Sequence, residues 1–323
     1  MSLGSGQVVD VLRAAGEPTR LRILALLARE ELAVLELCRV LGQSQPRVSR
    51  HLKLLTEAGL AERFPDGAWV FYRLAEEGEG AALARQVLAH VNPADPLVAR
   101  DVERLAAVEL ERAEGAAQYF AANAAHWDEL RALYIAEADV EAAVLRAAGP
   151  GPFRRLVDLG SGTGRMLTLL GPRAEHAVGL DLSQQMLNVA RRHVAEAQLP
   201  RCELRHGDIF DTRLPDASAD LVVVHQVLHY LTDPAAAVRE AARIVEPGGR
   251  LIIVDFAPHK LEFLREQHQH RRLGFAEGEM GRWLKEAGLD RTGEVALPPA
   301  RPDGLTVKIW CAGRAAAPQR TAA

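Results

Sequence analysis

The stretch Leu156-Val157-Asp158-Leu159-Gly160-Ser161-Gly162-Thr163-Gly164 decides the fold of the larger part of this 323-residue chain. An apolar run that ends in an acid and continues into a glycine-rich turn is typical of a buried strand followed by a ligand-binding loop. The glycine spacing restricts the ligand, because the dinucleotide fingerprint G-x-G-x-x-G requires glycine where Arg165 stands. The turn is therefore an acid followed by G-x-G-x-G, and it is not a dinucleotide fingerprint.

Strand-like and helical segments alternate on the C-terminal side of this turn, which predicts a parallel α/β sheet. The alternation begins at Phe153, directly after the interruption Gly149-Pro150-Gly151-Pro152. The expected strands, in chain order, are 155–159, 177–181, 202–206, 220–224 and 250–256, with further candidates near 291–297 and 305–312.

Three more motifs follow the glycine-rich turn in order. Val178-Gly179-Leu180-Asp181 ends a strand with an acid, His206-Gly207-Asp208-Ile209 follows the next strand, and Glu246-Pro247-Gly248-Gly249-Arg250 introduces a later one. Over about residues 119–313 the chain therefore resembles the class I methyltransferases that use S-adenosylmethionine (AdoMet). This resemblance implies a Rossmann-like domain with a mostly parallel seven-stranded sheet, and a site for AdoMet or its product S-adenosylhomocysteine (AdoHcy).

The same resemblance implies roles for individual residues. Asp181 is expected to accept both ribose hydroxyls, and Asp208 to lie near the adenine amino group, although a loop cap is the other interpretation of Asp208. His225 either borders the cofactor or only satisfies a loop, and it is the one candidate for a catalytic residue. The expected cofactor-binding residues are Asp158, Gly160, Gly162, Asp181, Leu182, Asp208 and His225.

The acceptor of a methyl group is not readable from the sequence. The stretch from Val224 to Tyr230 lacks the Asn-Pro-Pro-Tyr pattern of adenine and cytosine-N4 DNA methyltransferases, so methylation of DNA bases is not expected. A polar cluster after the fifth strand is interpreted as an anion site, a protein interface or a solvated helical face. A second, aromatic cluster resembles the helical segment that closes over the cofactor in related enzymes, or packs ordinarily. The polar cluster comprises His259, His268, His270, Arg271 and Arg272, and the aromatic one Tyr119, Phe120, His126, Trp127 and Tyr134.

The N-terminal part predicts a helix-turn-helix followed by a hairpin. Apolar helices are expected from Thr19 to about Arg29 and over Val34–Leu41, and a third helix over Gln45–Ala58. The Ser44 hydroxyl is expected to cap the third helix, and Val48, Leu52 and Leu55 recur at the spacing of a core-facing stripe. The β-like runs Leu60–Phe64 and Trp69–Leu74 flank the turn Pro65-Asp66-Gly67-Ala68 and predict a wing.

With LGQSQPRVSRHLKLLTEAGL and GAWVFYRL in this order, residues 8–75 resemble the ArsR/SmtB family of winged-helix repressors. The resemblance implies that the third helix reads double-stranded DNA from the major groove; a role in packing or dimerisation alone is the other interpretation. The net charge of −4 means that DNA contact depends on a local basic surface. The expected DNA-binding residues are Ser44, Gln45, Arg47, Ser49, Arg50, Lys53 and Arg63.

The metal sites of that family are not expected in this chain. Cys38 stands without a second cysteine nearby, and residues 91–125 contain no histidine. The three cysteines lie far apart in sequence, which predicts no disulfide and favours a reducing compartment. No apolar run is long enough to span a membrane, so a cytoplasmic protein is expected.

These motifs predict a multidomain chain: a winged-helix domain over 8–75, a helical connector and lid over 97–150, and a methyltransferase-like domain over 151–314. Val98, Val102, Leu105 and Val108 recur at helical spacing in the connector, and by resemblance such a helix pairs the subunits of a homodimer. Fusions of this type resemble AdoHcy-responsive regulators. The expected function is a dimeric repressor that binds operator DNA and senses AdoMet or AdoHcy; the alternative is an active small-molecule methyltransferase with an appended DNA-binding domain.

Overall fold

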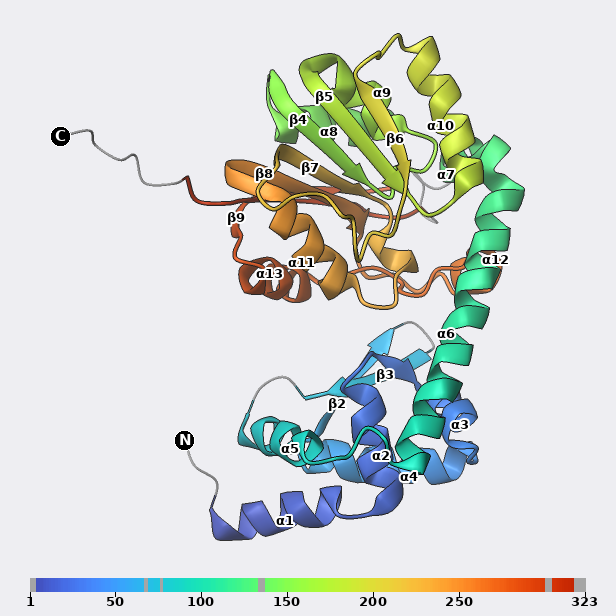
Figure 1. Ribbon diagram of the computed structural model, residues 1–323, viewed down its shortest axis with the longest axis vertical. Helices are drawn as coiled ribbons and strands as arrows, with labels where there is room; N and C mark the ends of the chain where they lie inside the picture. The colour runs from blue at the N-terminus through green and yellow to red at the C-terminus, as the bar shows by residue number, and fades with distance from the viewer. Residues whose placement is uncertain (1–3, 67–68, 76–77, 133–136, 300–303, 317–323) are drawn as a thin grey trace, which may run out of the picture. The chain divides into compact units, whose positions relative to one another are not determined.

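The computed structural model describes residues 4–66, 69–75, 78–132, 137–299 and 304–316 of the chain. The chain divides into two compact units, Met1–Gly115 and Ala116–Ala323, which are described separately (Figure 1). One helix, α6 (Pro96–Asn123), contributes residues to both units. Within the described ranges, no helix combines the length and apolar character needed to cross a bilayer.

The first unit is a winged helix-turn-helix. Its three strands form an antiparallel sheet in the order β1-β3-β2, so the hairpin lies beside the short strand that precedes α3. The third helix keeps its core-facing stripe as expected, because Val48, Leu52 and Leu55 are fully buried. The elements are α1 (Ser5–Ala15), α2 (Pro18–Leu27), β1 (Leu32–Ala33), α3 (Val34–Leu41), α4 (Gln45–Glu57), β2 (Ala61–Asp66), β3 (Trp69–Leu74) and α5 (Glu79–Ala89).

Two local expectations for this unit are corrected by the structure. Ser44 does occupy the cap position of α4, but its side chain makes no capping hydrogen bond. A cap side chain serves the second or third helical amide; here Pro46 has no amide proton, and the Arg47 amide already donates to the Ser44 carbonyl at 3.1 Å. The wing strand β2 continues through Asp66, and the remainder of the expected turn, Gly67 and Ala68, lies outside the described residues.

The second unit is built on a seven-stranded sheet in the order β6-β5-β4-β7-β8-β10-β9. The first five of these strands are parallel, and β10 runs antiparallel to both of its neighbours, which confirms the expected mostly parallel sheet. The strands are β4 (Phe153–Leu159), β5 (Ala174–Asp181), β6 (Cys202–His206), β7 (Ala219–His225), β8 (Val245–Phe256), β9 (Asp290–Leu297) and β10 (Val307–Gly313). The helical elements are η1 (Ala124–His126), α7 (Trp127–Ala132), α8 (Glu137–Ala148), α9 (Arg165–Leu170), η2 (Gly171–Arg173), α10 (Gln184–Glu196), η3 (Leu228–Tyr230), α11 (Pro234–Ile244), α12 (Phe263–His268) and α13 (Glu277–Glu286).

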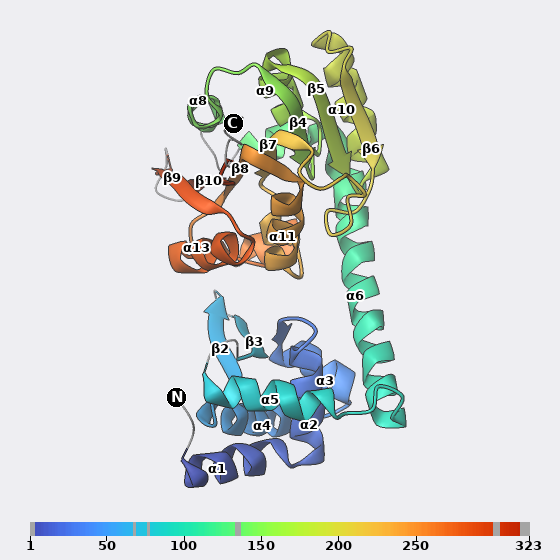
Figure 2. The ribbon, with the colours of Figure 1, turned by 60° about the vertical axis from the view of Figure 1, so that its left-hand side comes forward.

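Successive residues of the central strands belong to different cores, as a sheet covered on both faces requires. Val157 and Leu159 pack in the core that includes α11 and α13, whereas Leu156 packs in the core that includes α8 and α9. Figure 2 shows these two pairs of helices on opposite faces of the sheet. The carboxyl ends of the parallel strands therefore meet at one edge, which is where ligands bind in such folds.

The connector stripe has a different role from the expected one. Leu105 and Val108 of α6 are buried in the core of the first unit, together with Leu37 of α3 and Leu52 of α4. A leucine and a valine enclosed by their own chain leave no surface for a second subunit. Leu105 and Val108 therefore belong to the core of the first unit, and the pairing of two subunits through this helix, which stays a prediction, would need another face of α6.

Candidate functional site

The glycine-rich loop after β4 has the backbone of a ligand cradle. Gly160, Gly162 and Gly164 have φ angles of +70°, +51° and +82°, a region that residues with a Cβ rarely adopt. A Cβ added at Gly160 would clash with both methyl groups of Val227, whereas one added at Gly162 would meet nothing within 4 Å. Gly160 thus lets the segment after β7 close on the loop, and Gly162 leaves backbone open to a ligand.

Asp181, at the end of β5, braces this loop. Its Oδ2 atom accepts a hydrogen bond from the Gly162 amide at 2.7 Å, and its Oδ1 atom accepts one from the Ser183 amide at 2.8 Å. Burial raises the pKa of Asp181, and these backbone donors act in the opposite direction. Each carboxylate oxygen has a second lone pair, so the side chain can still accept hydrogen bonds from a ribose diol.

The other expected cofactor residues follow the same edge of the sheet. Asp158 is buried at the end of β4, and His225 ends β7 with a half-buried side chain. The Asp208 Oδ1 atom accepts a hydrogen bond from the Phe210 amide at 2.9 Å, so the loop-cap geometry considered for Asp208 is present. The Gly207 amide donates to the Asp181 carbonyl at 3.0 Å, which holds the loops after β5 and β6 together.

Two exposed apolar side chains complete the fit to an adenosyl ligand. Leu182 is 62 % exposed and Phe210 is 38 % exposed, and each follows one of the acids. Large apolar side chains left open beside carboxylates are suited to cover the faces of a purine while the acids accept its polar edges. These residues therefore fit AdoMet or AdoHcy. Phe210 was missed from the sequence, although its position two residues after Asp208 was the available signal.

The aromatic cluster that precedes the sheet packs against the borders of this site. Phe120 makes edge contacts with Trp127 at 5.3 Å and with Tyr230 of η3 at 4.9 Å between ring centroids. Both Phe120 and Trp127 also pack against a small buried cluster that includes Met186 of α10. The Thr163 hydroxyl of the glycine-rich loop donates to Asp128 Oδ1 of α7 at 2.8 Å.

This lid, defined as residues 119–129, thus contacts the glycine-rich loop, α10 and η3. Of the expected cluster, His126 is exposed and faces Glu129 at 3.5 Å instead of the site, and Tyr134 lies outside the described residues.

The polar cluster after β8 is not a uniformly solvated face. His270 and Arg272 are buried, and Arg272 donates to Glu279 at 2.8 Å. Burial lowers the pKa of His270 far below its ordinary value and that of His259 to about 4, so both imidazoles are uncharged at neutral pH. The solvated-face interpretation is therefore wrong for His270 and Arg272.

A buried pair that was not found from the sequence lies beside this cluster. His229 Nδ1 is 2.8 Å from Asp255 Oδ1, and the two residues are 1 % and 0 % exposed. Asp255 stands one residue before the end of β8, at the ligand-binding edge of the sheet. That position was the only sequence signal, because nothing in the spacing of residues 229 and 255 marks them as partners.

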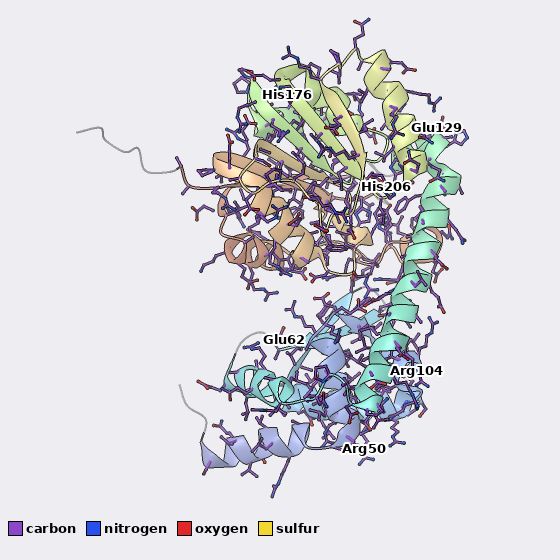
Figure 3. All side chains as sticks on the ribbon, viewed as in Figure 1. Arg50, Glu62, Arg104, Glu129, His176 and His206 are labelled. Atoms are coloured by element: carbon purple, nitrogen blue, oxygen red, sulfur yellow. The ribbon has the colours of Figure 1, made fainter. Side chains whose placement is uncertain are left out.

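The expected DNA-reading residues are brought together by α4 and the wing. Ser44, Gln45, Arg47, Arg50, Lys53 and Arg63 are exposed, and Ser49 is half-buried. Lys53 lies 3.7 Å from Glu57 one turn later, a distance at which an exposed pair contributes little. Figure 3 labels Arg50 on this helix. Most of these side chains are therefore exposed, as contact with phosphates and base edges requires.

The first half of α6 is fastened to the helix-turn-helix by ion pairs. Arg22 of α2 makes two hydrogen bonds with the buried carboxylate of Asp101, at 2.5 and 2.6 Å. Arg112 donates to Glu36 of α3 at 2.7 Å and to Glu30 at 3.0 Å. Burial raises the pKa of Glu30 to about 7 despite the facing guanidinium.

Comparison with known proteins identifies both segments. Residues 17–63 match the model of the bacterial regulatory protein arsR family, and residues 157–253 match that of a methyltransferase domain. The chain is 33 % identical over 123 residues to a demethylmenaquinone methyltransferase of Clavibacter sepedonicus, a match that covers 38 % of this chain and 49 % of that protein. An uncharacterized methyltransferase of Mycobacterium bovis is 39 % identical over 118 residues, which are 36 % of this chain and 46 % of that protein. The chain thus spans about half the length of the curated relatives it matches.

A solved structure shows the same fold as the second unit. It is a chain of the complex between the Haloferax volcanii Trm112 methyltransferase activator and a protein named as a methyltransferase, with a TM-score of 0.50 at 21 % identity. The match covers 61 % of this chain and 97 % of that chain. The methyltransferase domain implies the use of AdoMet. This chain therefore joins an ArsR-type helix-turn-helix segment to a methyltransferase domain of the class I fold.

Proposed function

We propose that this protein is a dimeric transcriptional repressor of the cytoplasm, and that its methyltransferase-fold unit senses AdoMet or AdoHcy. One observation carries the proposal: the two halves of the continuous helix α6 belong to the two sites. Its first half is fastened to the reading unit through Asp101 and Arg112, and its second half carries Phe120 of the lid. A change at the adenosyl site thus has a continuous helical route to the helix-turn-helix.

The lid at the second half of α6 contacts the borders of the adenosyl site, so its position depends on whether a ligand is bound there. The lid contacts the glycine-rich loop through Thr163 and η3 through Tyr230, and it packs on a buried cluster that includes Met186 of α10. Thr163 directly follows Gly162. Met186 and Tyr230 lie four and five residues after Leu182 and His225, which we also assign to the ligand. A ligand that orders these contacts binds with different affinities to different positions of the lid. Only a ligand with such a difference in affinity can shift the equilibrium between those positions.

The ion pairs between α6 and the helix-turn-helix are strong enough for the two to move together. Removing one partner of a buried ion pair such as Arg22–Asp101 costs about 3–5 kcal/mol, whereas allosteric couplings are typically about 1–3 kcal/mol. The coupling is therefore too small to break these pairs, and α6 moves together with α2 and α3. In a homodimer, such a movement changes the spacing of the two α4 helices on operator DNA.

The test is the affinity of the full chain for DNA from the region upstream of its own gene, measured by fluorescence anisotropy with and without AdoMet or AdoHcy. We expect one of the two to change the midpoint about 5–150-fold. The Asp181→Ala variant removes the brace of the glycine-rich loop and should lose the response, while Asp290→Ala, an exposed acid on the opposite edge strand, should keep it. Equal midpoints under all three conditions in the wild type would refute the proposal.

A second candidate function is an active AdoMet-dependent methyltransferase that acts on a small molecule. The observation that favours it is the buried His229–Asp255 pair at the ligand-binding edge. The demethylmenaquinone methyltransferase among the relatives is, by its name, an enzyme with a small-molecule acceptor. Formation of AdoHcy from AdoMet, lost in Asp181→Ala, tests this candidate independently of DNA.

A further inference from the structure

The His229–Asp255 pair has the geometry of a base held by an acid. Asp255 accepts from the His229 ring at 2.8 Å through Oδ1 and from the His229 backbone amide at 3.4 Å through Oδ2. A buried carboxylate facing Nδ1 favours the tautomer in which Nδ1 carries the proton. The lone pair is then on Nε2, and the imidazolium that forms when Nε2 takes a proton is stabilised by Asp255.

The order of strands places this pair next to the methyl-donating end of an adenosyl ligand. Asp208, which we assign to adenine, follows β6, and Asp181, which we assign to ribose, ends β5. The next strands along the edge are β4, β7 and β8, so the sulfur end of the ligand points toward β7 and β8. Val227, two residues before His229, packs directly on Gly160 of the glycine-rich loop. The pair therefore borders the part of the site where an acceptor must lie.

The surroundings of His229 select the class of acceptor. The rings of Tyr230, His270 and Phe256 lie 4.0, 4.2 and 4.9 Å from the His229 ring, measured between centroids. His270 is nine-tenths buried, and its Nδ1 atom has no hydrogen-bond partner among the described residues. These rings form an aromatic wall with an uncharged polar atom, which suits a flat neutral molecule.

We propose that His229, oriented by Asp255, is a catalytic base that removes the proton from a phenolic or enolic hydroxyl of a neutral, ring-containing acceptor as that oxygen takes the methyl group of AdoMet. The proposal rests on the second candidate function and adds to it a base and an acceptor class. Tyr230 and His270 enclose His229, so one of these rings must move to admit the acceptor.

The step balances without another reactant. The acceptor oxygen forms a bond with the methyl carbon as the bond from that carbon to sulfur breaks. The electron pair of the broken bond stays on sulfur and neutralises its positive charge, which leaves AdoHcy. The acceptor proton passes to His229 Nε2 and from there to water after the product leaves.

The first experiment measures AdoHcy formation by the full chain with AdoMet and a panel of phenol, 2-naphthol, 4-nitrophenol, benzoate and benzylamine. We expect turnover with the hydroxylated rings and none with benzoate or benzylamine. General-base catalysis contributes about 10²–10⁴-fold, so His229→Gln and Asp255→Asn should lose activity on that scale. The matched control is His176→Gln, an exposed histidine of β5 that Figure 3 labels, which should leave the rate unchanged.

A second measurement separates a base from a merely structural pair. Without its base the enzyme can use only acceptors that are already ionised, so His229→Gln should lose least with 4-nitrophenol and recover as pH rises. The charged or titratable groups around His229 are Asp255 of β8 and His259, His270 and Arg265 of the segment after it, and none of them is changed in this comparison. An equal loss for phenol and 4-nitrophenol at every pH would show a structural role and overturn the proposal.

Two further readouts do not depend on turnover. Calorimetry should give the same AdoMet affinity for the wild type and for Asp255→Asn; if the wild type does not bind AdoMet or AdoHcy at all, the proposed function fails as well. If it binds AdoMet but methylates no hydroxylated ring, only the present proposal fails. Nitrogen-15 spectra of the wild type should show a His229 ring with its proton on Nδ1, assigned by its change in Asp255→Asn. A proton on Nε2 instead would overturn the proposal even if His229→Gln does not fold.

Discussion

Replacing Glu30 with glutamine tests the physical basis of the joint between α6 and the helix-turn-helix. Glu30 lies 3.0 Å from Arg112, yet burial raises its pKa from 4.5 to about 7. The folded state therefore prefers the protonated acid more than the unfolded state does. This group's contribution to the free energy of unfolding is fully present below pH 4.5 and is lost as pH rises toward about 7.

The magnitude follows from the size of the shift. A pKa displaced from 4.5 to about 7 corresponds to about 3 kcal/mol between the ends of that pH range. Glutamine has the shape of the protonated acid and cannot ionise. We therefore expect Glu30→Gln to stabilise the first unit at pH 8 by up to about 3 kcal/mol and to have little effect at pH 5.

The assay is urea unfolding of the full chain between pH 5 and pH 8, followed by pulsed hydrogen–deuterium exchange so that α2 and α3 are resolved from the sheet. His51 of the same unit is present in both proteins, so its contribution to the pH dependence cancels in the difference between their free energies of unfolding. Glu111→Gln is the control, because Glu111 is an exposed acid that pairs with Arg39. A difference between wild type and Glu30→Gln that does not grow with pH would refute the reasoning.

Three other substitutions have expected outcomes. Arg50→Ala should weaken operator binding by about 1–3 kcal/mol in an anisotropy titration while calorimetric AdoMet binding stays unchanged, and a comparable loss of AdoMet affinity would contradict the separation of the two sites. Gly160→Ala should weaken AdoMet binding at least tenfold, because the new Cβ clashes with Val227 and the φ angle of +70° is strained for alanine. The double variant with Val227→Ala should recover only the part of the loss that is due to the clash. Full recovery would exclude backbone strain as a cause. Leu105→Ala should destabilise the first unit by about 2–5 kcal/mol in urea unfolding, whereas the exposed Leu110→Ala on the same helix should cost little; equal effects would mean that Leu105 is not a core residue.

Much of the architecture was predictable because local signals and tertiary structure agree. The seven expected strands match β4 to β10, and the central ones, such as β4, β7 and β8, carry apolar runs that mark them in the sequence. The expected helix Val34–Leu41 has its observed bounds because Gly42, with a φ angle of +65°, ends it. Such features depend on residues that are neighbours in sequence.

The candidate site was only partly predictable for the complementary reason. Asp181 and the glycines belong to short motifs, so their positions follow from local pattern. His229 and Asp255 are brought together only by the packing of η3 on the end of β8, and no local pattern reports that contact. The apolar face of the connector helix was predictable, but helical spacing does not report what covers Leu105 and Val108.

The sharing of α6 has a consequence for how such a protein can arise by gene fusion. A reading module cut after the wing or after α5 would lose Leu105 and Val108 and leave a hole in its own interior. Recombination that preserves folding must therefore break the gene beyond Arg112, inside a helix and not in a loop. A boundary drawn at a loop would therefore not release the first unit intact, because its core includes residues of α6.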